Sequence, residues 1–242
     1  MLVFIAFWIL LFLTIARPGN RTSFQHKSWQ DWLLDGTGLL FQGLAIPILQ
    51  ITLVYQFYSV LIPHLRDILV LPPMIAFLLS FVFVDYLYYW NHRLLHSRFF
   101  WRLHQVHHTV TQRDVLGTSR NTLWTSFFII YLWVHALFIY LLFDPKWYVL
   151  GISLTSILDL WRHSAIEPKQ GSFFDRAISP WLTLPRDHAW HHSPNPQTGN
   201  YGANFKLWDK LHRTNCTYDT APTHLGIDTQ LTLIQKLFFP IK

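Results

Sequence analysis

HRLLHSRFFWRLHQVHH, residues 92–108, contains five of the chain's 14 histidines, namely His92, His96, His104, His107 and His108. A second cluster, HAWHH, repeats the H-x-x-H-H spacing later in the chain, at His188, His191 and His192. On a helix, side chains three or four residues apart share a face, whereas adjacent side chains diverge by about 100°. Each doublet can therefore give one histidine to each of two ions. Together the clusters predict a paired metal centre assembled from separate parts of the chain.

A single histidine at a membrane surface is usually a polar interfacial group rather than a metal ligand. Eight histidines in three boxes are different, because eight buried imidazoles without a metal would need eight separate hydrogen-bonding solutions. Imidazole suits zinc, copper, iron and nickel, so the residue type alone does not choose the metal. We interpret the isolated histidines as structural residues and not as metal ligands; they are His26, His64, His135, His212 and His224.

The composition is that of a membrane protein. Hydrophobic residues make up 51% of the 242 residues and charged residues only 13%, while aromatic residues reach 17%. This length fits a single domain, which we expect to be one membrane domain over residues 1–242. The net charge of +6 is better explained by basic residues retained on the cytoplasmic side of a bilayer than by nucleic-acid binding. The one cysteine, Cys216, excludes an internal disulfide and a four-cysteine metal site.

Hydropathy predicts an all-α integral membrane protein with about four to five apolar segments. The first segment lacks the features of a cleaved signal peptide, so we interpret it as a retained helix. It is short for a span, and a cleaved or interfacial segment is the alternative. We expect residues 31–38 to be a connecting piece, Pro47 to kink the second segment, and residues 231–239 to lie in the membrane interface. The fifth segment is short enough to be a partial span. The predicted segments are residues 1–16, 39–62, 71–90, 124–143 and 147–161.

The first histidine box follows the third segment directly, after the aromatic residues 86–90 that are typical of a membrane boundary. Basic residues dominate the region that follows. By the positive-inside tendency, this face is cytoplasmic, and the loop after the first segment, with Arg17, Arg21 and Lys27, falls on the same face. The sequence thus predicts a histidine-rich cytoplasmic cap bordered by Arg93, Arg98, Arg102, Arg113 and Arg120.

Boxes of the form HxxxH, HxxHH and HxxHH, interleaved with apolar segments, resemble the fatty acid hydroxylase/sterol desaturase superfamily of membrane di-iron enzymes. The similarity extends to Asp85 and to YW before His92, and to NYG at 200–202 and WDKLHRT at 208–214. It covers roughly residues 75–230, the expected catalytic region. The resemblance implies O2-dependent hydroxylation or desaturation of a lipid C–H bond, two non-haem irons held by histidines, and electrons from outside.

The eight box histidines match the ligand boxes of the superfamily, and His163 matches a further histidine between the second and third boxes. The chain departs from the pattern at Asp159, where the superfamily often has His or Gln. A carboxylate four residues before His163 could ligate iron, orient a histidine, or only solvate the helix end, and the sequence leaves these open. A second departure is His212-Arg213 in place of Phe-Gly, which leaves that turn undefined.

Two further residues are candidates for support of the ligands. Asp85 lies two helical turns before His92, so we expect its carboxylate to accept a hydrogen bond from a ligating imidazole, or else to be solvated at the boundary. Asn200, in the NYG motif, is the other supporting candidate.

The sequence analysis therefore predicts an oxygenase that oxidises a fatty acyl, sterol or related isoprenoid lipid. Its partners would be the bilayer, the lipid and an external ferredoxin, cytochrome b5-like protein or flavin reductase, because the chain lacks a nucleotide-binding glycine motif and a cysteine set. One alternative is a zinc-dependent membrane lipid hydrolase, since zinc could take the same imidazoles. A metal transporter or sensor is the other, although the segments carry few charges at their centres. The substrate and the oxidised position do not follow from the sequence.

Overall fold

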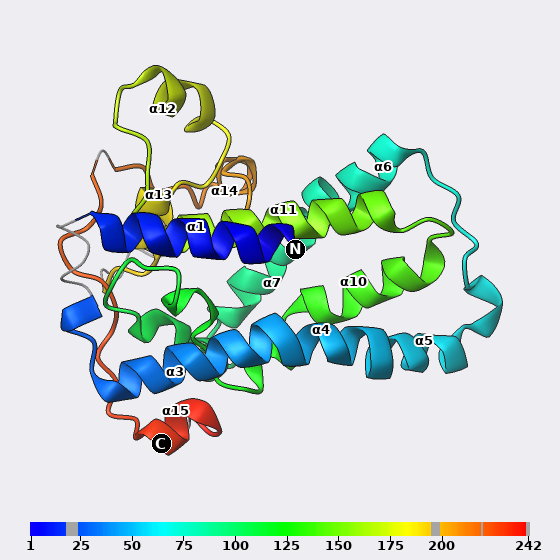
Figure 1. The fold of residues 1–242 in the computed structure, drawn as a ribbon, viewed down its shortest axis with the longest axis horizontal. Coiled ribbons are helices and arrows are strands. Elements are labelled where there is room, and N and C mark those ends of the chain that lie inside the picture. The colour runs from blue at the N-terminus through cyan, green and yellow to red at the C-terminus, as the bar shows by residue number, and fades with distance from the viewer. Residues whose placement is uncertain (18–23, 195–198, 219, 241–242) are drawn as a thin grey trace.

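A computed structural model describes residues 1–17, 24–194, 199–218 and 220–240. Within these ranges the chain is helical, with isolated β-bridges at Leu69–Leu142 and Leu182–Phe205 and no longer strand. The all-α prediction is confirmed for this part of the chain. Figure 1 shows long helices α1, α3–α5, α6–α7, α10 and α11, with α8 and α12–α15 gathered toward one end.

The second apolar segment is longer than expected. Helices α3 (Trp29–Leu40), α4 (Ile46–Leu49) and α5 (Tyr55–Leu61) join through π-helical turns at Phe41–Ala45 and Gln50–Val54 into one helix of 33 residues. The expectation that residues 31–38 form a connection is wrong. Ser28 caps α3, since its hydroxyl accepts from the Asp31 amide while the Asp31 carboxylate accepts from the Ser28 amide. This capping box starts the helix at the polar residues that had indicated a loop.

The third segment runs through α6 (Pro73–Leu78), a π-helical turn at Leu79–Phe83 and α7 (Val84–Leu95), so the helix continues into the first histidine box. The fourth segment is not continuous: α9 (Thr125–Phe128) and α10 (Ile130–Leu141) are separated at Ile129, whose backbone is extended. Asn91 on α7 bonds both sides of this break, donating to the Phe128 carbonyl at 2.9 Å and accepting from the Ile130 amide at 3.1 Å. The broken backbone is therefore satisfied by a side chain from the neighbouring helix.

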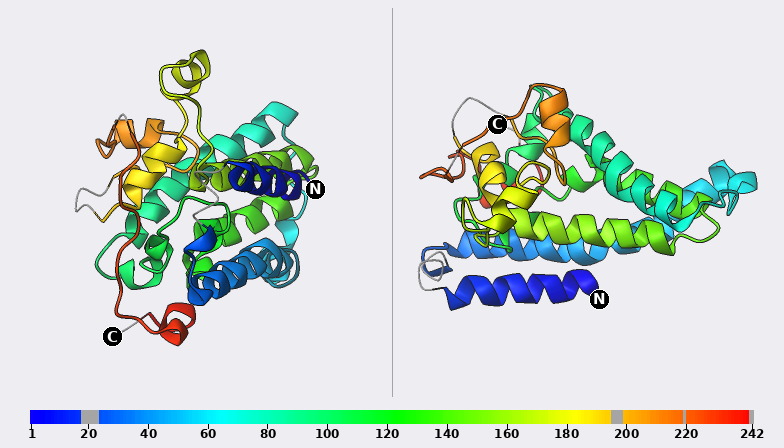
Figure 2. Two further views of the ribbon diagram at one scale, coloured as in Figure 1. Left: turned by 60° about the vertical axis from the view of Figure 1, so that its left-hand side comes forward. Right: turned by 90° about the horizontal axis from the view of Figure 1, so that it is seen from above.

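The helices form a bundle whose elements meet at the histidine-rich end. Helix α11 (Lys146–His163) packs against α1 (Leu2–Ala16) on one side and α6 on another, while α10 contacts α5 and α7. Small side chains allow the closest approach, because Gly151 on α11 lies against Ser80 with no room for a β-carbon. Figure 2 shows α1 lying alongside α11. The short helices α8 (Trp101–His104), α12 (Phe173–Ile178), α13 (Pro185–His191), α14 (Leu207–Leu211) and α15 (Leu233–Leu237) complete the described fold.

Two helices, Trp29–Leu61 and Pro73–Leu95, are long and apolar enough to cross a membrane, and α1 and α10 are shorter apolar helices. The bundle also exposes large apolar side chains such as Phe4, Leu40, Ile51 and Val60, as a lipid-facing surface does. The number of crossings remains a prediction. The C-terminal end of α1, which bears Arg17, lies at the same end as the histidine boxes (Figure 1), whereas Arg21 lies outside the described residues.

Candidate metal centre

Nine histidines gather into two adjacent groups, within each of which the candidate ligand atoms lie no more than 4.8 Å apart. Each H-H doublet is divided between the groups, which is the arrangement that the spacing favours. We call them the five-histidine group, made of His92, His96, His104, His108 and His191, and the four-histidine group, made of His107, His163, His188 and His192.

Helix C-terminal ends deliver most of these side chains. His92 lies in the last turn of α7 with His96 as its C-cap, and His163 is the last residue of α11. His188 lies on α13, which ends at His191. The C-terminal end of a helix carries partial negative charge from its unpaired carbonyls and favours a nearby cation. The C-terminal ends of these helices therefore lie close together, and their partial negative charges favour a cation between them.

The Nε2 atoms point toward one another inside each group. Neighbouring Nε2 pairs are separated by 2.9–3.4 Å. His96 Nε2 contacts the Nε2 atoms of both His108 and His191. An imidazole nitrogen offers either one proton or one lone pair, so three converging nitrogens cannot all be paired by hydrogen bonds. A cation bound at about 2.0–2.1 Å from each nitrogen would put neighbouring ligands about 3.3 Å apart and would satisfy them together. The donor set fits a metal ion.

Burial keeps these imidazoles in the form that binds metal. Desolvation lowers the pKa of His191 to about 4 and that of His107 to about 3, with neighbouring histidines adding to the effect. The pKa values of His104, His108 and His188 fall well below the usual range for the same main reason. At neutral pH these five rings are therefore uncharged, with lone pairs free for an ion.

One loop orients the five-histidine group. His191 Nδ1 donates to the Gly199 carbonyl at 2.7 Å, and His92 Nδ1 donates to the Tyr201 carbonyl at 2.8 Å. Between them Asn200 adopts a left-handed backbone, φ 56°, and its amide bonds the carbonyls of Asp187 and Cys216. These bonds fix the ring planes and the tautomers, so that Nε2 faces the metal position.

Asp85 supports the same loop rather than a histidine. Its buried carboxylate accepts from the Asn204 amide at 2.9 Å and from Trp208 Nε1 at 2.6 Å. The expected hydrogen bond from an imidazole to Asp85 is therefore wrong, and so is a solvated carboxylate. The carboxylate thus links α7 to the segment that follows Tyr201. Because the Tyr201 carbonyl bonds His92, Asp85 supports His92 indirectly.

Charged side chains support the four-histidine group. His107 Nδ1 donates to the Arg120 carbonyl at 3.1 Å. The Arg120 guanidinium is buried and bonds Asp35 at 2.6 Å and Asp31 at 2.7 Å, both on α3. Lys27 also pairs with Asp35 and, at 3.0 Å, with Asp114. This buried network holds the loop that carries the Arg120 carbonyl against α3.

A cavity of about 860 Å³ reaches both groups. His92 and His104 line it from the five-histidine group, and His107, His163 and His188 from the four-histidine group. Away from the histidines its walls come from α1 and the α3–α4 helix, including Phe4, Trp8, Leu40 and Leu44, which are also exposed on the outside. The metal positions therefore face a space of ligand size that continues to an apolar face of the bundle.

Comparison with known proteins identifies the family. The family model for fatty acid hydroxylases matches residues 77–214, more than half of the chain and all nine histidines. This chain belongs to the fatty acid hydroxylase family. Ornithine lipid hydroxylase OlsE of Rhizobium tropici is 32% identical over 144 residues, which are 58% of this chain and 41% of that protein. Alkylglycerol monooxygenase of Xenopus tropicalis is 27% identical over 141 residues, 56% of this chain and 29% of that protein.

The human alkylglycerol monooxygenase is 26% identical over 141 residues, again 56% of this chain and 29% of that protein. The chain thus spans less than half the length of these curated relatives. No solved structure matches it.

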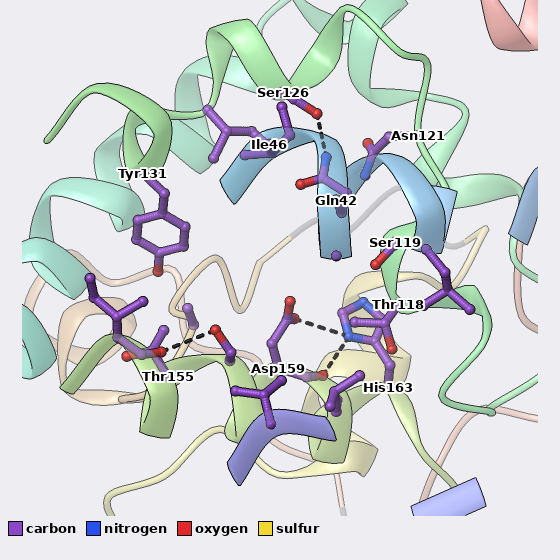
Figure 3. Close-up of a pocket in the computed structure, with 18 of the residues that line it drawn as sticks. Gln42, Ile46, Thr118, Ser119, Asn121, Ser126, Tyr131, Thr155, Asp159 and His163 are labelled. Carbon is purple, nitrogen blue, oxygen red and sulfur yellow. Dashed lines mark hydrogen bonds and ion pairs between the residues drawn. The ribbon is translucent and has the colours of Figure 1, made fainter. Parts of the chain in front are cut away.

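Asp159, where this chain departs from the expected His or Gln, lies outside both histidine groups. Its carboxylate pairs with Arg162 at 2.6 Å and lies 3.2 Å from His163 Nδ1, which also donates to the Asp159 carbonyl at 2.8 Å. Figure 3 shows both contacts to His163 beside the cavity. Asp159 thus contacts Nδ1 of His163, the ring nitrogen that faces away from the other histidines, and this contact orients the imidazole.

The second departure, His212-Arg213, keeps a turn that favours glycine, because Arg213 has φ 57°. The ring of His212 stacks on Tyr89 at 5.0 Å between centroids. None of the isolated histidines joins either described group; His135, for example, bonds the Tyr148 hydroxyl at 3.0 Å.

Several supporting residues were not expected from the sequence. Asp35 and Arg120 form the buried network described above, and Asp209 accepts from the Tyr201 and Gly202 amides at 2.8 Å each. The available signal for Asp31 was the capping-box pattern that it forms with Ser28. The carbonyl groups of Gly199, Tyr201 and Arg120 left no signal, because every residue has one.

Proposed function

We propose that this protein is a membrane-bound non-haem di-iron oxygenase that hydroxylates an unactivated C–H bond of a lipid, with desaturation as the related outcome. The observation that carries the proposal is the pair of converging histidine groups at the end of a cavity bordered by apolar, outward-exposed helices. The names of the relatives, a lipid hydroxylase and a monooxygenase, favour hydroxylation. The fatty acyl, sterol and isoprenoid classes remain the candidate substrates.

The nine histidines would hold two irons, five ligands on one side and four on the other. When bound, the irons would supply the chemistry that activates O2 with external electrons. The chain's own contribution is positional. Loop 199–201 and Asp159 hold ring nitrogens toward the ions, while the cavity walls exclude water and hold one carbon of the lipid near them. Holding the lipid carbon in a fixed position lowers the part of the reaction barrier that comes from bringing the reacting groups together.

We further propose that residues 1–242 act as one integral membrane domain, with the catalytic region at 75–230 and the histidine end on the cytoplasmic face. Arg17 at the same end as the boxes supports this orientation. The electron donor would be a ferredoxin, a cytochrome b5-like protein or a flavin reductase. Cysteine labelling from either side of the membrane, at positions replacing Ser97 and Ser193, should place both on the cytoplasmic side. Labelling from opposite sides would contradict a shared centre.

The test of function is turnover of lipid extracts by the purified protein with a ferredoxin–reductase pair. We expect oxygen incorporated from ¹⁸O2 into a lipid, in an amount that depends on reductant. A zinc-dependent hydrolase would instead release lipid fragments without O2 or reductant. A metal transporter or sensor would leave the lipids unchanged and would move or release metal.

A further inference from the structure

The cavity lining combines apolar and polar side chains. Phe4, Trp8, Leu44 and Ile46 are apolar, and amide and hydroxyl side chains lie among the other lining residues. Some of these polar groups are already bonded, since Gln42 bonds Ser126 and Thr118 donates to the Val115 carbonyl. A lining of this kind fits a ligand that has both a polar group and an apolar tail. The polar side chains include Gln42, Thr118, Ser119, Asn121, Ser126 and Tyr131.

Tyr131 presents a hydroxyl that is fully buried and has no hydrogen-bond partner. Its ring is fixed by stacking on Tyr88, at 4.6 Å between centroids, and on His135, at 5.0 Å. Figure 3 shows the hydroxyl pointing into the cavity, toward the helix that carries Thr155. A held, buried hydroxyl is normally satisfied, so its partner is expected to come from a molecule in the cavity.

Asn121 supplies the second group of this kind, since its Oδ1 is buried and has no hydrogen-bond partner. It follows Arg120, whose carbonyl accepts from His107 Nδ1. In Figure 3 the Asn121 amide faces the cavity beside Gln42, which is itself held by Ser126, and lies across the pocket from Tyr131. An amide oxygen accepts and a phenol hydroxyl can donate, so the two together fit a ligand that carries both donors and acceptors.

The charges around the cavity select against an ionised group. Asp159 lines the cavity but is already paired with Arg162, which also donates to the Ala203 carbonyl. No other acidic or basic side chain, the histidines aside, lies among the described residues that line the cavity. An uncharged ligand group therefore needs no new counter-ion in this buried space.

We propose that the Tyr131 hydroxyl and the Asn121 amide bind uncharged hydroxyl or amide groups of the lipid substrate, so that oxidation takes place close to the polar end of the lipid. The inference rests on the proposed function for its reaction and on the cavity for its ligand. The tail then runs outward between α1 and α4, away from the histidines. The two residues set the substrate class and the position of oxidation, and they have no part in the metal chemistry.

Binding tests the proposal without turnover. Monoolein and methyl oleate share an acyl tail, but only monoolein carries hydroxyl donors. In detergent-purified full-length protein, Tyr131→Phe and Asn121→Leu should each weaken monoolein binding about five- to tenfold and leave methyl oleate within about twofold. Tyr55→Phe, which changes a tyrosine outside the cavity lining, should alter neither. Equal affinity for monoolein in wild type and both variants would overturn the proposal. It would mean that water, and not the lipid, bonds Tyr131 and Asn121.

The position of oxidation provides the second arm. Fragmentation of the oxidised lipid in a mass spectrometer should place the new oxygen within a few carbons of the polar group, and Tyr131→Phe should spread it along the chain. Oxygen placed near the tail end by the wild type would contradict the proposal. If no lipid is oxidised by any variant, the proposed function fails while the binding result still decides the role of these two residues.

Discussion

The two histidine groups are neighbours, yet they are oriented by different kinds of partner. In the five-histidine group the ring nitrogens of His92 and His191 bond backbone carbonyls of one loop. In the four-histidine group His107 depends on a carbonyl that a buried ion-pair network holds in place, and His163 on Asp159. The direct partners of the imidazoles therefore differ, because a carboxylate contacts a ring nitrogen only in the four-histidine group among the described contacts.

This difference means that the two ion positions can be disturbed separately. A substitution that bends loop 199–201 should affect the five-histidine group first, because Asp159 and Arg120 lie elsewhere in the chain. A substitution of Asp159, the carboxylate that contacts His163, should affect the four-histidine group and leave the loop intact. The predictions below use this separation.

The largest effect is expected for loss of a ligand. His191→Ala and His188→Ala each remove one imidazole, from the five- and the four-histidine group respectively, and each should abolish lipid oxidation. Metal analysis should show about one ion per chain lost in each variant, since a buried site with a missing ligand binds metal far more weakly. His224→Ala, an exposed histidine outside both groups, is the control. Full activity in either ligand variant would show that its group is not part of the centre.

A bend in the loop comes next. A β-carbon at Gly199 would lie 2.4 Å from the Thr214 carbonyl oxygen, so Gly199→Ala must move the backbone that bonds His191. We expect a loss of about 2–4 kcal/mol of unfolding free energy, together with metal lost from the five-histidine group. Chemical denaturation and metal analysis measure the two effects.

Gly36→Ala is the matched control, because nothing lies within 4 Å of a β-carbon there. On its helix it should raise stability by about 0.5–1 kcal/mol. If Gly199→Ala behaves like Gly36→Ala, the loop does not orient His191.

A smaller effect is expected for the carboxylate behind His163. Asp159→Asn removes the charge, but the Asp159 carbonyl still accepts from His163 Nδ1. The four-histidine group should bind metal about tenfold more weakly, at the low end of what supporting residues contribute. Competition with a chelator measures this affinity, with Asp144→Asn, an exposed acid paired with Lys146, as control. A loss as large as that of His163→Ala would instead make Asp159 a direct ligand.

The smallest effect is expected at the edge of the ion-pair network. Asp31 caps α3 and pairs with Arg120, but it is partly exposed, and Arg120 keeps its buried bond to Asp35. Asp31→Ala should lower the free energy of unfolding by about 1–2 kcal/mol and leave the metal content unchanged. If Asp31→Ala weakened metal binding about tenfold, as expected for Asp159→Asn, then Asp31 and Asp35 would act on the four-histidine group as one unit.

The sequence predicted the histidine groups well because ligand spacing is a local property. Whether a doublet divides between two ions depends on the angle between adjacent side chains, which the helical repeat sets. The helical start at Ser28 was also readable, since Ser28 and Asp31 form a capping box, but the polar run after it favoured a connection instead.

The supporting contacts were less predictable for two physical reasons. Gly199, Tyr201 and Arg120 act through carbonyl groups, so their side chains carry no trace of the role. Asp85 visibly needed a partner, yet its partner amide belongs to Asn204, 119 residues away. Only the packing of α7 against the loop brings them together. The gap at Ile129 depends in the same way on Asn91, whose role needs the neighbouring helix to be in place.

The most direct test of the central claim is the iron and zinc content of the wild-type protein, purified in detergent after expression with both metals supplied. The two imidazole groups offer two ion positions, and the proposed function predicts that iron fills them, with about two irons per chain and little zinc. Less than about one iron per chain, or zinc filling both positions, would contradict the claim that this chain is a di-iron oxygenase.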